Sequence, residues 1–200
     1  MERQFLYRFP YGIGWLLWMA WIVWKKPVSI TPSSLVLHGL VWTWEEYVFH
    51  RWVLHASMYP MYHYLHHLKW TRLSTFFSPQ WLIVPMVYVN YRLTNVLFGR
   101  AYGENSLLFT PMYYMLFEWV HYRSHFSLAS DSACIIAIKQ YHRLHHVDET
   151  TNYGITSPLW DWIGGTLHPE MMGVLRKRDV LLGAFPMLWF YSCSTSMQKE

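Results

Sequence analysis

Apolar residues gather in four long segments that polar stretches separate. Each segment is 14 to 23 residues long and has the length and character of a helix. Ser33 or Ser34 can cap the second helix, and Gly99 to Asn105 reads as a turn between the last two segments. The pattern predicts an all-α integral membrane protein with about four transmembrane helices. The segments are Tyr11–Trp24, Leu35–Phe49, Phe76–Phe98 and Leu107–Val120.

The lengths of the segments leave open whether each one spans the membrane. The clean apolar cores of the first, second and fourth segments are only about 14 to 15 residues long, whereas a membrane span needs about 20. Flanking aromatic or neutral polar residues can lengthen each one, and a buried or re-entrant role is the alternative. A fifth apolar patch, Val180–Tyr191, is broken by Gly183 and Pro186. It is too short to span, so it predicts an interfacial or packed helix.

The composition supports a membrane protein. The 200 residues are 53% hydrophobic, 20% aromatic and only 14% charged, against about a quarter charged in soluble domains. Thirteen Trp and fifteen Tyr suit the two membrane interfaces. The net charge of +4 without a basic stripe argues against a nucleic-acid partner. Two cysteines make neither a disulfide framework nor a Cys-rich zinc site. A single domain over residues 1–200 is expected.

The basic residues predict the orientation. With four spans and both termini on one side, that side carries 12 of the 16 Lys and Arg residues, and the far side carries 4. By the positive-inside rule, both termini and the long polar stretches then face the cytosol.

Histidines mark those polar stretches. Ten of the twelve fall in four boxes, arranged as a short box followed by a His-x-x-His-His box, used twice. His38 lies among apolar residues and is expected to pack against another helix, and His168 is expected in a loop. The boxes are His50/His55, His63/His66/His67, His121/His125 and His142/His145/His146.

The spacing within the boxes indicates metal binding. Residues three and four apart share a helix face, which holds for three of the boxes. His50 and His55 are five apart, so we expect the helix to end or bend between them. Imidazole is the commonest metal ligand among side chains, and ten imidazoles exceed the needs of one ion. The count predicts two metal ions with about five ligands each.

The ligand type narrows the choice of metal. A structural zinc site is tetrahedral, usually contains cysteine, and does not need ten ligands. An all-nitrogen site of higher coordination suits a redox metal with an open position, and neutral imidazoles avoid the cost of burying carboxylates. We therefore expect two iron ions, with O2 as co-substrate and an apolar substrate. Imidazole also binds zinc, so zinc can replace iron in a purified sample.

Six residues outside the boxes are candidates for orienting a ligand or binding substrate. Glu46 and Glu118 each lie within one helical turn of a box, and an exposed helix-end carboxylate is the alternative for Glu118. Tyr114 is either a pocket residue or an interfacial aromatic. Asn152 and Asp161 either orient imidazoles or cap helices. Tyr153, next to Asn152, is a candidate for anchoring a substrate head group.

The four boxes in this order resemble the fatty acid hydroxylase / sterol desaturase superfamily of membrane enzymes. The resemblance covers about Trp42 to Pro169. Trp44–His50 and Tyr153–Thr166 look most like the fatty acid 2-hydroxylase branch. Phe117 and Glu118 depart from the family, where Tyr and Asp are common. The resemblance implies four membrane helices with a cytosolic helical cap, two irons in an endoplasmic reticulum enzyme, and electrons from cytochrome b5 and its reductase. No cytochrome b5 domain precedes the boxes, so a separate donor is expected.

The implied activity is O2-dependent hydroxylation of carbon 2 of a fatty acyl chain, free or in ceramide. Sterol oxidation or desaturation and carotenoid hydroxylation are alternatives, because all begin with abstraction of a hydrogen at the same kind of metal centre. A non-enzymatic membrane metal-binding protein or transporter, and a zinc hydrolase, are alternatives of another class.

Overall fold

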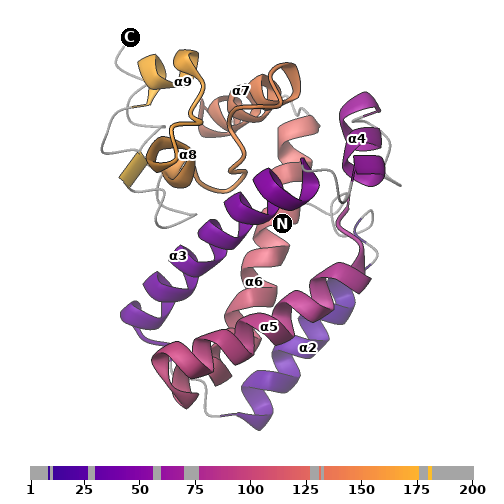
Figure 1. Cartoon of the computed structure of the whole chain (residues 1–200). Helices are drawn as coiled ribbons and strands as arrows, with labels where there is room; N and C mark the ends of the chain where they lie inside the picture. Colours follow the sequence, from indigo (N-terminus) through magenta and orange to yellow (C-terminus); the bar gives the residue numbers. More distant parts are fainter. Residues whose placement is uncertain are drawn as a thin grey trace. The chain divides into compact units, whose positions relative to one another are not determined.

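In the part of the chain that the structure describes, the regular elements are all helices (Figure 1). The computed structural model describes residues 9, 11–26, 30–55, 60–69, 77–126, 131, 133–175 and 180–181, and these contain no strand. The all-α prediction is confirmed. The helices are α2 (Gly12–Lys25), α3 (Pro32–Phe49), the π-helix η1 (His50–Leu54), α4 (Pro60–Leu68), α5 (Gln80–Phe98), α6 (Arg100–His125), α7 (Ala133–Val147), α8 (Leu159–Ile163) and α9 (Pro169–Val174).

The four apolar segments form α2, α3, α5 and α6. The expected turn at Gly99 to Asn105 is wrong for all but its first residue, because α6 begins at Arg100. Gly99 alone makes the turn, with φ of 90°, a conformation that glycine adopts without steric cost. The Arg100 side chain then bonds to Glu104 one turn later, at 3.0 Å, which favours the helix over a loop.

Among the described residues, no helix is both long and apolar enough to cross a membrane. The number of spans and their orientation stay predictions. The fifth apolar patch, Val180–Tyr191, lies outside the described residues except for its first two.

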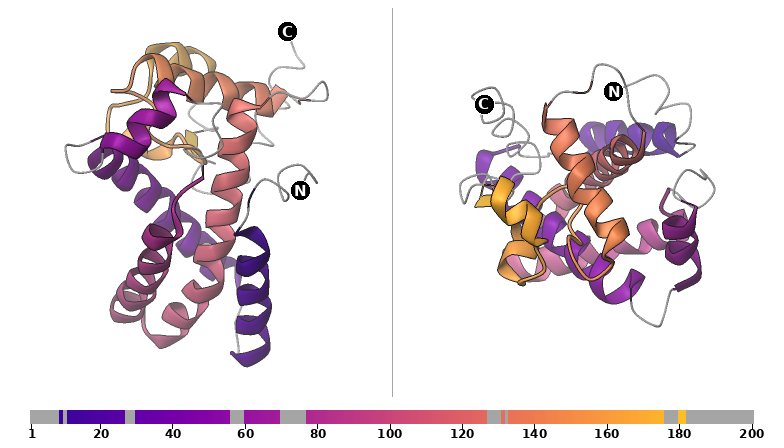
Figure 2. Two further views of the ribbon diagram at one scale, coloured as in Figure 1. Left: turned by 90° about the vertical axis from the view of Figure 1, so that its right-hand side faces the viewer. Right: turned by 90° about the horizontal axis from the view of Figure 1, so that it is seen from above.

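The chain divides into two compact units. Unit 1 comprises residues 1–38 and 77–119, and unit 2 comprises residues 39–76 and 120–200. In unit 1, α2 lies beside α6 (Figure 2): the Trp18 indole donates to the Leu107 carbonyl at 3.0 Å. The Trp15 indole donates to Gln80, at the start of α5, at 2.8 Å. His38 is buried, and its ring stacks on Phe109 at 4.9 Å, as expected of a packed histidine.

Unit 2 contains all four histidine boxes. Its core comprises the inner face of α7 and the loop that follows, with Tyr141, His145, Asp161 and Met171 fully buried. Helices α7, α8 and α9 lie together (Figures 1 and 2). Helix α8 is held to the C-terminal part of α3 by a hydrogen bond from the Trp160 indole to a threonine hydroxyl, 3.0 Å long.

Gly103 marks a close approach of α5 and α6 within unit 1. A Cβ atom there would lie 2.6 Å from Cβ and 2.9 Å from Cα of Asn95. Gly14, in α2, has nothing within 4 Å of its Cβ position. The two glycines are therefore a matched pair for testing this contact.

We expect Gly103→Ala to lower the free energy of unfolding by about 2 kcal/mol, because overpacking against backbone outweighs the better helix propensity of alanine. Gly14→Ala should raise it by up to about 1 kcal/mol. Thermal unfolding followed by circular dichroism measures both. Equal stability of the two variants would contradict the packing of α5 on α6.

Candidate metal centre

The ten box histidines converge in two clusters within unit 2. In the first cluster, five imidazoles each offer a nitrogen within 4.8 Å of all the others, and in the second cluster four do so. His121 joins the second cluster, with its Nε2 atom 3.1 Å from that of His66 and 3.3 Å from that of His125. The first cluster is His50, His55, His63, His67 and His145, and the second is His66, His121, His125, His142 and His146.

Each His-x-x-His-His box serves both clusters. In α4, His63 and His67 belong to the first cluster and His66 to the second. In α7 the roles reverse, so that His145 alone joins the first cluster. The reason is helical geometry: residues four apart lie nearly above one another, whereas adjacent residues point about 100° apart. Two adjacent histidines therefore face two different sites.

A π-helical turn aligns the first box. Helix α3 ends at Phe49, and η1 continues the chain with a hydrogen bond from the His55 amide to the His50 carbonyl, 3.1 Å long. This i to i+5 pattern brings residues five apart onto one face, and the two rings lie 5.0 Å apart. The expected end or bend between these histidines is thus a change of helix type. Such single π-turns are common at functional sites.

Backbone carbonyls fix the tautomers of two ligands in the first cluster. The Nδ1 atom of His50 lies 2.5 Å from the Tyr153 carbonyl oxygen, and that of His145 lies 2.7 Å from the Thr151 carbonyl oxygen. A carbonyl oxygen only accepts, so each Nδ1 carries the proton. Each Nε2 atom then directs a lone pair into the cluster, as a metal ligand does.

The spacing of the Nε2 atoms fits metal coordination. Within each cluster neighbouring Nε2 atoms lie 2.8 to 3.3 Å apart. Two metal–nitrogen bonds of about 2.1 Å at a right angle place their nitrogens about 3.0 Å apart. Hydrogen bonding does not explain the arrangement, because His63 Nε2 has three such neighbours and one ring nitrogen has one proton or one lone pair.

The ten imidazoles are neutral at pH 7. Burial, together with the neighbouring histidines, lowers the pKa of His66 to about 3 and that of His67 to about 2. The pKa values of His55 and His146 are lowered to about 4, with burial as the main cause. The remaining six pKa values are lowered for the same reasons. Neutral imidazole is the form that binds a metal ion.

Asp161 holds the loop that orients these ligands. Its carboxylate accepts four hydrogen bonds, from the Tyr141 hydroxyl, the amides of Tyr153 and Gly154, and the Thr166 hydroxyl, at 2.5 to 2.8 Å. Burial raises the pKa of Asp161 to about 6 despite these donors, so the carboxylate is the main form at pH 7. The carboxylate thereby fixes Tyr153, whose carbonyl orients His50.

Glu46 holds the next part of the same loop. Its carboxylate accepts from the Ile155 amide, from the Thr156 amide at 2.8 Å and from the Thr156 hydroxyl at 2.6 Å. Asn152 acts similarly: its side chain donates to the Tyr141 carbonyl at 3.0 Å and accepts from the His168 amide at 2.8 Å. Glu46 and Asp161 thus bond to the loop around the ligands, Asn152 ties that loop to α7 and to His168, and Tyr153 contacts a ligand through its carbonyl.

The other two candidates lie in unit 1. Glu118 is fully buried and accepts a hydrogen bond from the Ser78 amide at 2.9 Å. The Tyr114 hydroxyl accepts from the Gln80 side chain at 3.0 Å. A part for either residue in binding substrate stays a prediction.

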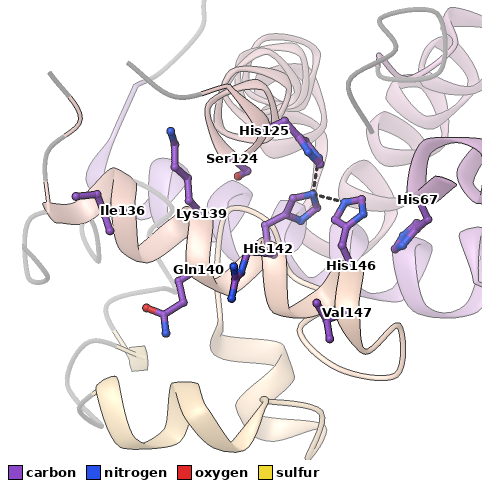
Figure 3. Close-up of a pocket in the computed structure, with 10 residues that line it drawn as sticks. His67, Ser124, His125, Ile136, Lys139, Gln140, His142, His146 and Val147 are labelled. Carbon is purple, nitrogen blue, oxygen red and sulfur yellow. Dashed lines mark hydrogen bonds between the residues drawn. The ribbon is translucent and has the colours of Figure 1, made fainter. Parts of the chain in front are cut away.

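A pocket of about 630 Å³ opens beside the second cluster (Figure 3). His125, His142 and His146 point into it together, with His67 of the first cluster next to His146. The His67 and His146 rings stack at 4.2 Å, so the two clusters are in contact. The outer wall comes from α7 and from Ser124, and includes Ile136, Lys139, Gln140, Arg143 and Val147.

A model of the family described as fatty acid hydroxylase matches residues 35–166. This range covers well over half of the chain and includes every box histidine. The chain belongs to the fatty acid hydroxylase family.

Relatives of known activity agree with this family assignment. The chain is similar to mouse fatty acid 2-hydroxylase, with 29% identity over 158 residues, or 72% of this chain and 42% of the relative. It is 26% identical over 179 residues to a dihydroceramide fatty acyl 2-hydroxylase of Arabidopsis thaliana, covering 76% and 71% of the two chains. It thus spans less than half the length of the mouse relative. No solved structure matches the chain.

Sequence reasoning missed two residues that lie beside the first cluster. The Thr151 carbonyl acts through the backbone, so its residue type carries no signal. Glu149 approaches the rings of His55 and His67, at 3.7 and 3.4 Å. A carboxylate three residues after a His-x-x-His-His box is a signal that the sequence offered.

Replacing Asp161 tests the support of the loop. Asp161→Asn puts an NH2 group against backbone N–H donors and leaves buried donors unpaired, so we expect a loss of about 3 kcal/mol in the free energy of unfolding. Asp148→Asn is the control, because the Asp148 side chain bonds to Thr150 at the exposed start of the loop. Chemical denaturation measures both, and similar losses would refute the role of Asp161.

Proposed function

We propose that this chain hydroxylates carbon 2 of a fatty acyl chain, free or in ceramide, with O2 as co-substrate and two iron ions held by the two histidine clusters. The observation that carries the proposal is the convergence of five Nε2 atoms in each cluster of a fatty acid hydroxylase family member. The position on the acyl chain is supported by the names of the relatives, which are fatty acid and dihydroceramide fatty acyl 2-hydroxylases.

The donor set fits iron. Each cluster offers five neutral nitrogens, one more than the four ligands that close a tetrahedral structural zinc site, and imidazole ligands suit iron. When bound, two iron ions would supply the O2 and one-electron chemistry that no side chain provides. Zinc, which imidazole also binds, can replace iron in a purified sample.

The residues of the protein hold the metal ligands in a fixed arrangement. The Tyr153 and Thr151 carbonyls keep the lone pairs of His50 and His145 directed inward. Asp161 and Glu46 keep the loop in place. Because C–H hydroxylation requires the target carbon to be held near the metal, a rigid ligand frame determines which carbon reacts.

The setting in the cell is part of the proposal. The four apolar segments and the low charge support a multi-pass membrane protein of the endoplasmic reticulum, with the histidines and both termini in the cytosol. Two electrons are needed for each O2, and we propose that cytochrome b5 and its reductase deliver them as separate proteins. Tyr114 and Glu118 are proposed to help position the lipid.

Metal content gives the first test. The purified full-length chain should hold about two metal ions, and His55→Ala and His125→Ala should each reduce the content to about one or less, because each removes a ligand from one cluster. His168→Ala is the control, since His168 lies outside both clusters and caps α9. Elemental analysis measures the ratio. A wild-type chain without bound metal would refute the proposal.

Lipid analysis gives the second test. Cells lacking their own fatty acid 2-hydroxylase should gain one oxygen in their ceramide acyl chains when they express this chain. The gain should be absent with His145→Ala and retained with His168→Ala. Mass spectrometry of total lipids measures this change. Altered sterols or carotenoids with unchanged sphingolipids would assign another substrate, and no change in any lipid would count against an enzyme.

A further inference from the structure

Glu149 lies on a tight turn that closes α7. The Asp148 amide bonds to the Leu144 carbonyl at 2.8 Å, and the Thr151 amide bonds back to the Asp148 carbonyl at 3.1 Å. The Asp148 carboxylate accepts from the Thr150 amide and hydroxyl, at 3.1 and 2.6 Å. The backbone on either side of Glu149 is therefore fixed, although its side chain is 52% exposed.

This turn supplies a hydrogen-bond acceptor and a negative charge to the first cluster. Its last residue is Thr151, whose carbonyl orients His145. The two carboxylate oxygens of Glu149 face the Nδ1 atoms of two further ligands, one at 3.7 Å from His55 and one at 3.4 Å from His67. Neither contact is a formed hydrogen bond, but the negative charge beside each Nδ1 atom favours the proton there and the lone pair on Nε2 in both rings.

Two of the five ligands in the first cluster thus have a hydrogen-bond acceptor at Nδ1, and two more have the Glu149 carboxylate within 3.7 Å of Nδ1. The fifth, His63, comes from the same helix as His67. Among the described residues the buried Nδ1 atoms of His142 and His146 in the second cluster, like that of His67 in the first, have no hydrogen-bond partner. His67 differs from them in having the Glu149 carboxylate 3.4 Å away. The two sites therefore differ in the charge and the acceptors that surround their ligands.

We propose that Glu149 is a positioning residue that makes the first cluster the tighter of the two metal sites. The inference rests on the proposed function only in taking both clusters to hold metal. A metal ion withdraws electrons from the imidazole and strengthens the attraction of its Nδ1–H for a carboxylate. The carboxylate in turn makes the ring a better donor. Because His55 and His67 both belong to the first cluster, the charge of Glu149 strengthens metal binding at that cluster.

The test is the release of iron from the full-length chain, loaded anaerobically with Fe²⁺, to an excess of a chromophoric chelator. The wild-type chain should release its iron in two phases of equal size. Glu149→Gln keeps the shape and removes the charge, and should speed the slower phase by about 10- to 100-fold while leaving the other unchanged. The melting temperature of the metal-free chain should not change, because the side chain is half exposed.

Glu170→Gln is the matched control. Glu170 is an exposed glutamate at the start of α9 in the same unit, and its replacement removes the same charge. Both phases should keep their wild-type rates. If Glu149→Gln leaves both phases unchanged, or speeds both equally, the inference is wrong.

Variants that retain one cluster assign the phases. In a His125→Ala background the remaining iron should be in the first cluster, and Glu149→Gln should speed its release. In a His55→Ala background it should not. A wild-type chain that holds no iron would overturn this inference together with the proposed function. Site-selective release without any lipid hydroxylation would overturn the proposed function alone.

Discussion

Nitrogen lone pairs that point at one another repel, and the structure of unit 2 depends on holding ten of them in two small volumes. The Nε2 atoms of the first cluster nevertheless converge. Those of His50 and His145 carry lone pairs, because the proton of each ring lies on Nδ1 and is donated to a carbonyl oxygen. Such an arrangement is stable only if a bound cation compensates for the lost hydration of the nitrogens, or if a rigid surrounding structure holds the rings in place. The burial of the rings, which lowers their pKa values, excludes protons as that cation at neutral pH.

The rigid frame consists of buried carboxylates paired with backbone amides. Asp161 and Glu46 do not contact the ligands; they accept hydrogen bonds from the loop that does. A buried carboxylate is costly unless several donors surround it, and each of these has at least three. Because the buried carboxylates need these donors, they hold three separate segments together: the end of α3, the middle of α7 and the loop before α8.

The sharing of α4 and α7 between clusters links the two sites. Each helix directs two histidines to one cluster and one to the other, so no movement of either helix changes one site alone. The contact between the His67 and His146 rings follows from this sharing. The clusters still differ, since the turn after α7 places Glu149 and the Thr151 carbonyl beside the first cluster.

The apolar pattern predicted four of the helices, and the histidine spacing predicted the composition of the centre. Four apolar segments correspond to α2, α3, α5 and α6, and the number and spacing of the histidines indicated two groups of about five. Local spacing fixes which side chains share a helix face. It does not fix which faces meet, and so the crossing of His66 and His145 to the opposite cluster, and the loop-holding role of Glu46 110 residues away from Thr156, were decided by tertiary packing. The sequence also did not predict the π-turn at His50. A spacing of five residues fits a bend as well as a wider helix, and the convergence with the other ligands selects the wider helix.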